Sequence, residues 1–471
     1  MFKRVLIANR GEIALRINRA CKELGIGTIA IYSEPDALTR YVRKADESYL
    51  VGPGPISGYL NIYGIIELAK NAGADAIHPG YGFLSENTEF ARACADAGIT
   101  FIGPNPAAIK DMGLKIESRE RAQKAGIPVI PGSEALTDAE DAVSFAESIG
   151  FPVMIKASAG GGGRGLRICR NADDVRRQMA ISQSEARKAF GNDSIFIEKY
   201  LEQPHHIEFQ IVADKHGNIV HLGERDCSIQ RRHQKMIEVA PSLILDESLR
   251  QRIGEAAVAA ARAVDYDSVG TVEFLVDKNR NFYFLEMNTR IQVEHTITEE
   301  ITGIDLVQAM IRIATGEKLW FHQRDVQLRG FAIQCRINAE DPLNDFMPAT
   351  GKITEYQSPG GYGVRLDGNA YRGYTVPPYY DSMLAKLIVR GATWEETVAR
   401  AQRCLGEYLI RGIKTTIPFY RNIMKDEVFR SGDFSTAYVE ERFKHLAYSK
   451  ERDKVDVVCA VAAAIVAHSK L

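Results

Sequence analysis

The sequence lacks every cysteine pattern that would point to a metal site or a disulfide framework. Its 471 residues include only seven cysteines, which are scattered along the chain without a C-x-x-C pair or a cysteine–histidine spacing typical of zinc. Scattered single cysteines are typical of proteins from a reducing compartment. We therefore expect a cytoplasmic protein without structural disulfides.

Long apolar runs and an excess of one charge are also missing. The longest apolar run, Val457–Ala467, is too short to cross a bilayer, which needs about 20 residues. Met1–Asn9 is likewise too short for a secretion signal. The net charge is −2, so no broad basic surface is available for nucleic acid or anionic lipid. We expect neither a membrane nor a nucleic acid as a partner.

Two common nucleotide-binding motifs are absent as well. The first strand–helix turn, Asn9–Glu12, holds one glycine and not G-x-G-x-x-G, so a dinucleotide fingerprint is missing. The glycines at 160–163 precede a strand-like segment, whereas a P-loop precedes a helix that opens with Gly-Lys-Ser/Thr. A nucleotide site in this chain must therefore be built in another way.

The chain opens with a β-α-β pattern and continues with strand-rich regions. Lys3–Ala8 and Thr28–Tyr32 are strand-like, and Glu12–Leu24 between them is an amphipathic helix. With 45% hydrophobic residues, the chain is long enough for several domains of mixed α/β and α+β structure. The expected parts are an N-terminal α/β domain at 1–113, a linker helix at 114–130, a lid at 131–202, a C-terminal domain at 203–445 and a helical tail at 446–471.

The most informative stretch is a predicted hairpin of Thr271–Val276 and Phe282–Asn288. Both segments alternate, and the residues between them favour a turn. The hairpin places Glu273 opposite Glu286, with Asn288 on the same face. Facing carboxylates are destabilising unless positive charge lies between them. Two carboxylates and an amide oxygen suit magnesium or manganese, and the alternative is a surface hairpin whose glutamates pair with lysines.

A glycine-rich hairpin is the second informative feature. A strand that ends in Lys156 leads into Gly160–Gly163, Arg164 closes the run, and another strand follows. Glycine has no Cβ, so its backbone N–H groups can approach phosphate closely. We expect a flap that closes over a nucleotide and excludes water. The alternative is a plain flexible loop.

Two dense polar runs complete the pattern. Glu224–Lys235 (ERDCSIQRRHQK) follows the strand-like Ile219–Leu222, and Thr289–His295 (TRIQVEH) follows the metal-binding hairpin. A basic run is usually a solvated face, but a nucleic-acid binder would carry a wider basic excess than this chain has. We therefore expect these runs to bind a small anion.

Six motifs together resemble the biotin carboxylases, over about residues 1–445 and in the family's order. They are IANRGEIA at 7–14, HPGYGFLSEN at 78–87, AGGGGRG at 159–165, ERDCSIQRRHQK at 224–235, EMNTRIQVEH at 286–295 and RINAEDP at 336–342. The resemblance implies an ATP-grasp fold with a Rossmann-like N-terminal domain, a mobile glycine-rich lid and a C-terminal biotin carboxylase domain. It also implies an ADP-forming ligase that uses ATP, magnesium or manganese, bicarbonate and biotin, usually as a homodimer.

The resemblance assigns roles to individual residues. Those that hold ATP would be Lys115, Lys156, Gly161, Gly162, Gly163, Glu198, Lys199, Leu201, His206, Gln230 and His233. The metal ligands would be Glu273, Glu286 and Asn288, and bicarbonate would meet Lys235, Arg290, Gln292 and Val293. Glu294 would be the catalytic base, and Arg336 would stabilise the negative ureido oxygen of biotin. Leu114 departs from the acidic or small residue that often precedes the linker lysine in this family.

Simpler readings of these residues remain open from the sequence. Arg290 and Glu294 lie four residues apart and would pair with each other, Arg336 would be a surface strand residue, and His233 a structural histidine. At the level of the whole chain, another ATP-grasp ligase, such as a carboxylate–amine ligase, would share the flap and metal set. Such a ligase should lack the runs QRRHQK and RIQVEH, and this chain has both. A noncatalytic nucleotide-binding regulator should have lost a metal carboxylate or the base, and all are present.

The chain has no attachment site for biotin. Met424-Lys425 is followed by Asp426, which does not match the Ala/Val-Met-Lys-Met context of a biotin carrier. We therefore expect a separate partner, either a biotin carboxyl carrier protein or a biotinylated carboxyltransferase subunit. Length and tail most resemble the separate biotin carboxylase chains of two-subunit pyruvate carboxylases. The alternative is the biotin carboxylase of an acetyl-CoA or another acyl-CoA carboxylase.

Overall fold

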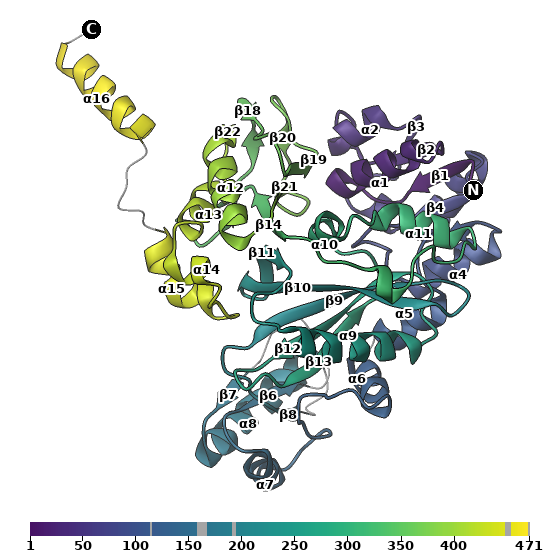
Figure 1. Cartoon of the computed structure of the whole chain (residues 1–471), viewed down its shortest axis with the longest axis vertical. Helices are drawn as coiled ribbons and strands as arrows, with labels where there is room; N and C mark the ends of the chain where they lie inside the picture. The colour runs from purple at the N-terminus through teal and green to yellow at the C-terminus, as the bar shows by residue number, and fades with distance from the viewer. Residues whose placement is uncertain (114, 158–166, 191–194, 448–453, 470–471) are drawn as a thin grey trace.

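The computed structural model describes residues 1–113, 115–157, 167–190, 195–447 and 454–469. Figure 1 shows an N-terminal unit in purple, a small unit at the bottom, and a large unit in teal and green. The yellow helix α16 (Lys454–Ser469) stands apart from all three. The mixed α/β and α+β architecture confirms the predicted fold class.

The N-terminal unit is a parallel sheet covered on both faces. Its strands are ordered β3-β2-β1-β4-β5. Strands of such sheets are buried on both sides, which explains the continuous apolar run Val5–Ile7. The strands are β1 (Arg4–Ile7), β2 (Gly27–Tyr32), β3 (Glu47–Leu50), β4 (Ala76–His78) and β5 (Thr100–Phe101). The helices are α1 (Gly11–Glu23), α2 (Arg40–Lys44), α3 (Ile62–Asn71), α4 (Thr88–Asp96) and α5 (Pro106–Gly113).

The small unit is an antiparallel sheet, β7-β6-β8, packed against two helices. β6 and β7 pair with Val153 opposite Cys169, which confirms the predicted strand–loop–strand order. Gly161, Gly162 and Gly163 in the connecting loop lie outside the described residues. The elements are β6 (Val153–Ala157), β7 (Arg167–Cys169), β8 (Ile195–Lys199), α7 (Ala139–Ile149) and α8 (Ala172–Phe190). The expected linker helix corresponds to α6 (Lys115–Lys124).

The large unit is built on an eight-stranded antiparallel sheet in the order β13-β12-β9-β10-β11-β14-β21-β19. Its strands are β9 (His205–Ala213), β10 (Ile219–Arg231), β11 (Gln234–Ala240), β12 (Val269–Val276), β13 (Phe282–Asn288), β14 (Phe331–Asn338), β19 (Val364–Gly368) and β21 (Met383–Gly391). The helices packed on this sheet include α9 (Glu247–Arg262), α10 (His295–Thr302), α11 (Leu306–Ala314) and α12 (Trp394–Glu407).

Short elements complete the large unit. They are the strand pairs β15 (Glu340–Asp341) with β16 (Met347–Pro348), β17 (Gly351–Lys352) with β20 (Thr375–Val376) and β18 (Glu355–Gln357) with β22 (Leu409–Arg411), and the helices α13 (Ile417–Ile423), α14 (Glu427–Ser431) and α15 (Tyr438–Ala447). The predicted helical tail is present as α16, and its described side chains are exposed. Among the described residues, no helix is both long and apolar enough to cross a membrane.

One element differs from its sequence-based bounds. The strand expected at Ile219–Leu222 runs on to Arg231 as β10, so the first polar run is largely part of a strand. Residues from Leu222 to Gln230 are all buried. Polar residues can occupy a buried strand because charged partners on neighbouring strands satisfy them. The sheet therefore carries a buried ionic cluster.

Candidate active site

The predicted hairpin is present, and its two glutamates face each other. Phe274 pairs with Phe284, but the next pair is Glu273 with Glu286, because the register shifts there. Leu285 is the extra residue of this β-bulge. In a regular hairpin Leu285 would lie opposite Glu273. The bulge therefore decides which side chain meets Glu273.

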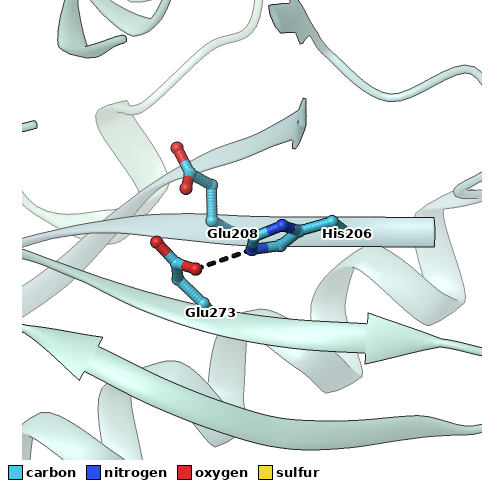
Figure 2. Close-up of side chains that lie close together, drawn as sticks. All are labelled: His206, Glu208 and Glu273. Carbon is cyan, nitrogen blue, oxygen red and sulfur yellow. Dashed lines mark hydrogen bonds and ion pairs between the residues drawn. The ribbon is translucent and has the colours of Figure 1, made fainter. Parts of the chain in front are cut away.

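The buried Glu273 carboxylate is surrounded by four polar groups. Oε2 lies 2.6 Å from His206 Nε2 (Figure 2), and Oε1 accepts hydrogen bonds from Lys235 Nζ at 2.9 Å, Asn288 Nδ2 at 2.8 Å and Gln292 Nε2 at 2.7 Å. Burial alone would raise the pKa of Glu273, but Lys235 and His206 hold it well below its ordinary value. The alternative of a solvated surface hairpin is wrong for this carboxylate.

Lys235 lies at the centre of three buried carboxylates. Its Nζ is 2.5 Å from Glu208, 2.9 Å from Glu273 and 2.8 Å from Glu294. Burial favours the neutral amine, yet these carboxylates help to hold the pKa of Lys235 well above its ordinary value. Ligand atoms of His206, Glu208 and Glu273 come within 4.8 Å of one another, as metal ligands do (Figure 2). The ammonium of Lys235 contacts two members of this group, Glu208 and Glu273.

Glu294 lies between two cations. Lys235 Nζ holds its Oε1 at 2.8 Å, and Arg336 Nη2 holds its Oε2 at 2.9 Å. Arg336 Nε also donates to the fully buried Glu238 at 2.5 Å. Burial would raise the pKa of Glu294, but Lys235, Arg336 and Arg225 lower it below its ordinary value. Arg336 is therefore part of the buried cluster, and its interpretation as a surface strand residue is wrong.

A fully buried arginine, Arg225, also belongs to this cluster. Its guanidinium donates to Glu208 at 2.5 Å, Thr271 at 3.1 Å and Gln292 at 2.9 Å, and it also reaches Gln210 and Thr298. A buried arginine is tolerated only when its donors are satisfied. Arg225 thereby fixes the side chain of Gln292, one of the residues expected to meet bicarbonate.

Arg290 pairs with Glu86 and not with the base. Its Nε donates to Glu86 at 2.8 Å, and its Nη2 donates to the Asn288 side-chain oxygen at 2.9 Å. Within the part of the chain that the structure describes, Arg290 makes no ion pair with Glu294. The alternative in which these two residues simply pair is therefore wrong. The contact with Asn288 connects the expected anion site to the expected metal site.

The described residues expected to hold ATP lie on two sheets and on the segments beside them. On the small sheet Lys156 forms an ion pair with Glu198, while Lys199 Nζ donates to the carbonyl oxygens of Gly150 at 2.8 Å and Phe151 at 3.0 Å. The others are placed as follows: Leu201 follows β8 and is half-buried, His206 and Gln230 are buried on β9 and β10, His233 is exposed at the β10–β11 turn, and Lys115 opens α6 with a side chain outside the described set. The exposed turn does not support the structural-histidine interpretation of His233.

Sequence reasoning missed three members of the cluster, Glu208, Arg225 and Glu238, and also Glu86, which pairs with Arg290. One signal for Glu208 was available, because His206, Glu208 and Gln210 alternate along β9 and so share one face. Glu208 lies opposite Glu273 in the β9–β12 register. No comparable local signal marks Glu238, whose role depends on the pairing of β11 with β14.

The arrangement suits chemistry on anions. Three cations, Lys235, Arg225 and Arg336, meet Glu208, Glu238, Glu273 and Glu294 in a buried space. Lys235 and Arg336 both donate to Glu294, whose carboxylate can accept a proton. Glu273, Glu286 and Asn288, whose oxygens are expected to bind a divalent cation, belong to the neighbouring hairpin. Such a site can bind a small anion, deprotonate it and bring it to a metal-bound phosphate.

Comparison with known proteins agrees with this chemistry. Family models described as the biotin carboxylase N-terminal domain, the carbamoyl-phosphate synthase L chain ATP-binding domain and the biotin carboxylase C-terminal domain match residues 1–109, 115–321 and 334–441. The 2-oxoglutarate carboxylase small subunit of Hydrogenobacter thermophilus is 53% identical over all of both chains. The A subunit of the Methanothermobacter thermautotrophicus pyruvate carboxylase is 56% identical, over 94% of this chain and 90% of its own.

A solved structure extends the similarity to three dimensions. It is the biotin carboxylase domain dimer of the Hydrogenobacter thermophilus 2-oxoglutarate carboxylase, in complex with MgADP, ADP and bicarbonate. The two chains are 54% identical, with a TM-score of 0.89, over 96% of this chain and all of that one. The fold is therefore the ATP-grasp fold of these enzymes, as the sequence motifs predicted. The chain belongs to the biotin carboxylase family of ATP-dependent ligases.

Proposed function

We propose that this chain carboxylates biotin carried on another polypeptide, with ATP and bicarbonate as co-substrates. The observation that carries the proposal is the buried group in which Glu294 lies between Lys235 and Arg336. A base held by two cations has a place for a small anion beside one cation and for a developing oxyanion beside the other.

Glu294 acts as the general base in this proposal. It removes the proton of bicarbonate, while Lys235 and Arg290, with Gln292 and Val293, hold the anion. Without these cations, repulsion between bicarbonate and ATP would be severe. The deprotonated oxygen attacks the γ-phosphorus of ATP, which releases ADP and forms carboxyphosphate.

The cations that lower the pKa of Glu294 also make it a weak base before substrates arrive. When bicarbonate binds to Lys235 and biotin binds to Arg336, these cations stabilise the Glu294 carboxylate less, and the pKa of Glu294 rises. The carboxylate therefore becomes a stronger base only when both substrates are bound. Because the base is weak until both substrates are bound, ATP is protected from reaction with water.

Carboxyphosphate then breaks into CO₂ and phosphate. The phosphate takes the N1 proton of biotin, and N1 forms a bond to CO₂, which gives N1-carboxybiotin. Arg336 stabilises the negative charge that develops on the ureido oxygen, for which its planar fork is better suited than a lysine ammonium. Closure of the glycine-rich lid, which contains Gly161, Gly162 and Gly163, excludes water from these reactive species.

The nucleotide and metal roles follow the same logic. Lys156 and His206, with the other residues of the expected ATP set, position the nucleotide. Glu273, Glu286 and Asn288 would hold Mg²⁺ or Mn²⁺, because they offer carboxylate and amide oxygens on one face of the hairpin. When bound, the ion neutralises charge on the transferring phosphoryl group.

The partner is the biotin-carrying polypeptide, and the chain works as a cytoplasmic homodimer. The dimer is supported by the solved Hydrogenobacter thermophilus domain, which is described as one. For the final acceptor we propose a 2-oxo acid, with pyruvate first, because of the similarity to the Methanothermobacter thermautotrophicus pyruvate carboxylase chain. The full-length match to a 2-oxoglutarate carboxylase small subunit supports 2-oxoglutarate as the second candidate.

The test of the proposed function is ADP release by the purified chain with MgATP and bicarbonate, with and without free biotin. We expect release that requires bicarbonate, rises with biotin, and is lost in Glu294→Gln and Arg336→Ala. ATP hydrolysis indifferent to bicarbonate and biotin would point to another ATP-grasp ligase. The acceptor is tested by adding the biotin-carrying polypeptide with pyruvate or 2-oxoglutarate and measuring which is carboxylated.

A further inference from the structure

A completely buried lysine lies beside the cluster. Lys386 on β21 lies opposite Arg336 in the sheet, and none of its side chain is exposed. Its Nζ donates to the backbone oxygen of Val293 at 3.0 Å and forms an ion pair with Glu12 Oε1, also at 3.0 Å. The mechanism proposed above uses neither charge of this pair.

The pair connects distant parts of the chain. Glu12 lies on α1 of the N-terminal unit, and its Oε1 also accepts a hydrogen bond from the hydroxyl of Tyr81, in the loop after β4. Val293 lies in the segment between β13 and α10, between Gln292 and the base Glu294. A chain of buried polar contacts therefore runs from the N-terminal unit to the backbone of the base.

Stability gives no sufficient reason for such a pair. Two buried charges lose their hydration, and apolar residues of similar size are often at least as stabilising. Lys386 lies opposite Asp367 on β19, which is favourable, but also opposite Arg336 on β14, and like charges in this position repel each other. A buried charge in an unfavourable place is a reason to look for a functional role.

The hydrogen bond from Lys386 to the Val293 oxygen suggests such a functional role. The Val293 oxygen belongs to the peptide that ends at the Glu294 nitrogen, and in a planar trans peptide the C=O and N–H point in opposite directions. By holding this oxygen, Lys386 fixes the orientation of the peptide and directs a carbonyl dipole away from any anion on its other side. An unrestrained carbonyl that turned toward bicarbonate would repel it.

We propose that Lys386 and Glu12 are positioning residues, which hold the Val293–Glu294 peptide in the orientation that binds bicarbonate. This inference rests on the proposed function of the segment from Arg290 to Glu294. It predicts that loss of the lysine weakens bicarbonate use specifically. The residues expected to hold the nucleotide lie on other elements, so nucleotide binding should be affected little.

The experiment compares the Michaelis constants of Lys386→Met, Lys386→Arg and the double variant Glu12→Gln/Lys386→Met in bicarbonate-dependent ADP release. For Lys386→Met we expect the KM for bicarbonate to rise on the order of 10- to 100-fold, with the KM for MgATP changed less than about twofold. Lys386→Arg, which keeps the charge, should recover part of the loss. The double variant removes both buried charges, so its Tm should return toward that of the wild type, whereas its KM for bicarbonate should stay high.

A matched control is Arg250→Met. Arg250 pairs with the buried Glu224 at 2.9 Å, away from the 290–294 segment, so its loss should lower Tm and leave the KM for bicarbonate unchanged. The inference is overturned if the double variant recovers the wild-type KM for bicarbonate, or if Lys386→Met raises both Michaelis constants alike. A wild-type chain without bicarbonate-dependent ADP release would instead refute the proposed function, and the inference with it.

Discussion

In the large unit the Lys235 side chain is 11% exposed and contacts three carboxylates, whereas in the small unit Arg176 is 44% exposed and pairs with Glu140, which is 67% exposed. Both regions are rich in ion pairs. Exposed pairs contribute about 0 to 1 kcal/mol, because water already stabilises both charges. A buried cluster loses much more when one member is removed, since the remaining charges have no water to replace it. Burial, and not the number of ion pairs, therefore marks the site.

The largest expected effect in this comparison is on catalysis at Glu294. Glu294→Gln keeps the size of the side chain and removes its ability to take a proton. We expect bicarbonate-dependent ADP release to fall about 10²- to 10⁴-fold, the range for loss of a general base. Steady-state kinetics would measure it, with Tm as the control for folding. Activity within a few-fold of the wild type would exclude Glu294 as the base.

The second prediction concerns stability at Lys235. Lys235→Met leaves Glu208, Glu273 and Glu294 facing one another without the cation that they share. We expect the free energy of unfolding to fall by about 3 to 5 kcal/mol, measured by urea denaturation at neutral pH. The loss should shrink as the pH falls and the carboxylates take up protons. A loss that is the same at all pH values would show that packing, and not charge, is responsible.

A buried group without a counter-charge provides the third prediction. The His78 ring is completely buried, and burial, followed by the charge of Arg16, lowers its pKa to about 3. The unfolded chain binds a proton at His78 below about pH 6.5, and the folded chain does not, so stability must fall as the pH decreases from 6.5 toward 3, by about 1.4 kcal/mol per unit. In His78→Gln this part of the pH dependence should disappear from urea denaturation curves. An unchanged fall of stability between pH 6.5 and 3 would contradict the prediction.

The smallest effect is expected on the exposed side of the comparison. Arg176→Ala removes the pair with Glu140 but leaves no desolvated charge behind. Unfolding free energy should change by no more than about 0.5 kcal/mol, and biotin-dependent activity should remain at the wild-type level. A loss comparable to that of Lys235→Met would remove the distinction between the two regions.

The sequence predicted those parts of the site that depend on local order. The hairpin itself follows from alternation and a turn, and the flap follows from its glycines, whereas the facing of Glu273 and Glu286 also depends on the bulge at Leu285. Residues joined by long-range strand pairing were not predictable in this way. Glu238 reaches Arg336 because β11 pairs with β14. Lys386 lies beside Arg336 because β21 follows β14 in the sheet, and from there its Nζ donates to the Val293 oxygen. Neither neighbour is near in sequence, so no local pattern indicates them.

The central claim is that the buried cluster activates bicarbonate to attack ATP, and heavy-oxygen-labelled bicarbonate tests it most directly. During turnover with MgATP and free biotin, the attacking oxygen stays on phosphorus when carboxyphosphate breaks down. We predict one labelled oxygen in each inorganic phosphate, and loss of this signal together with turnover in Glu294→Gln. Phosphate that carries only solvent oxygen, at an undiminished rate of ADP release, would show that water is the nucleophile and would contradict the account.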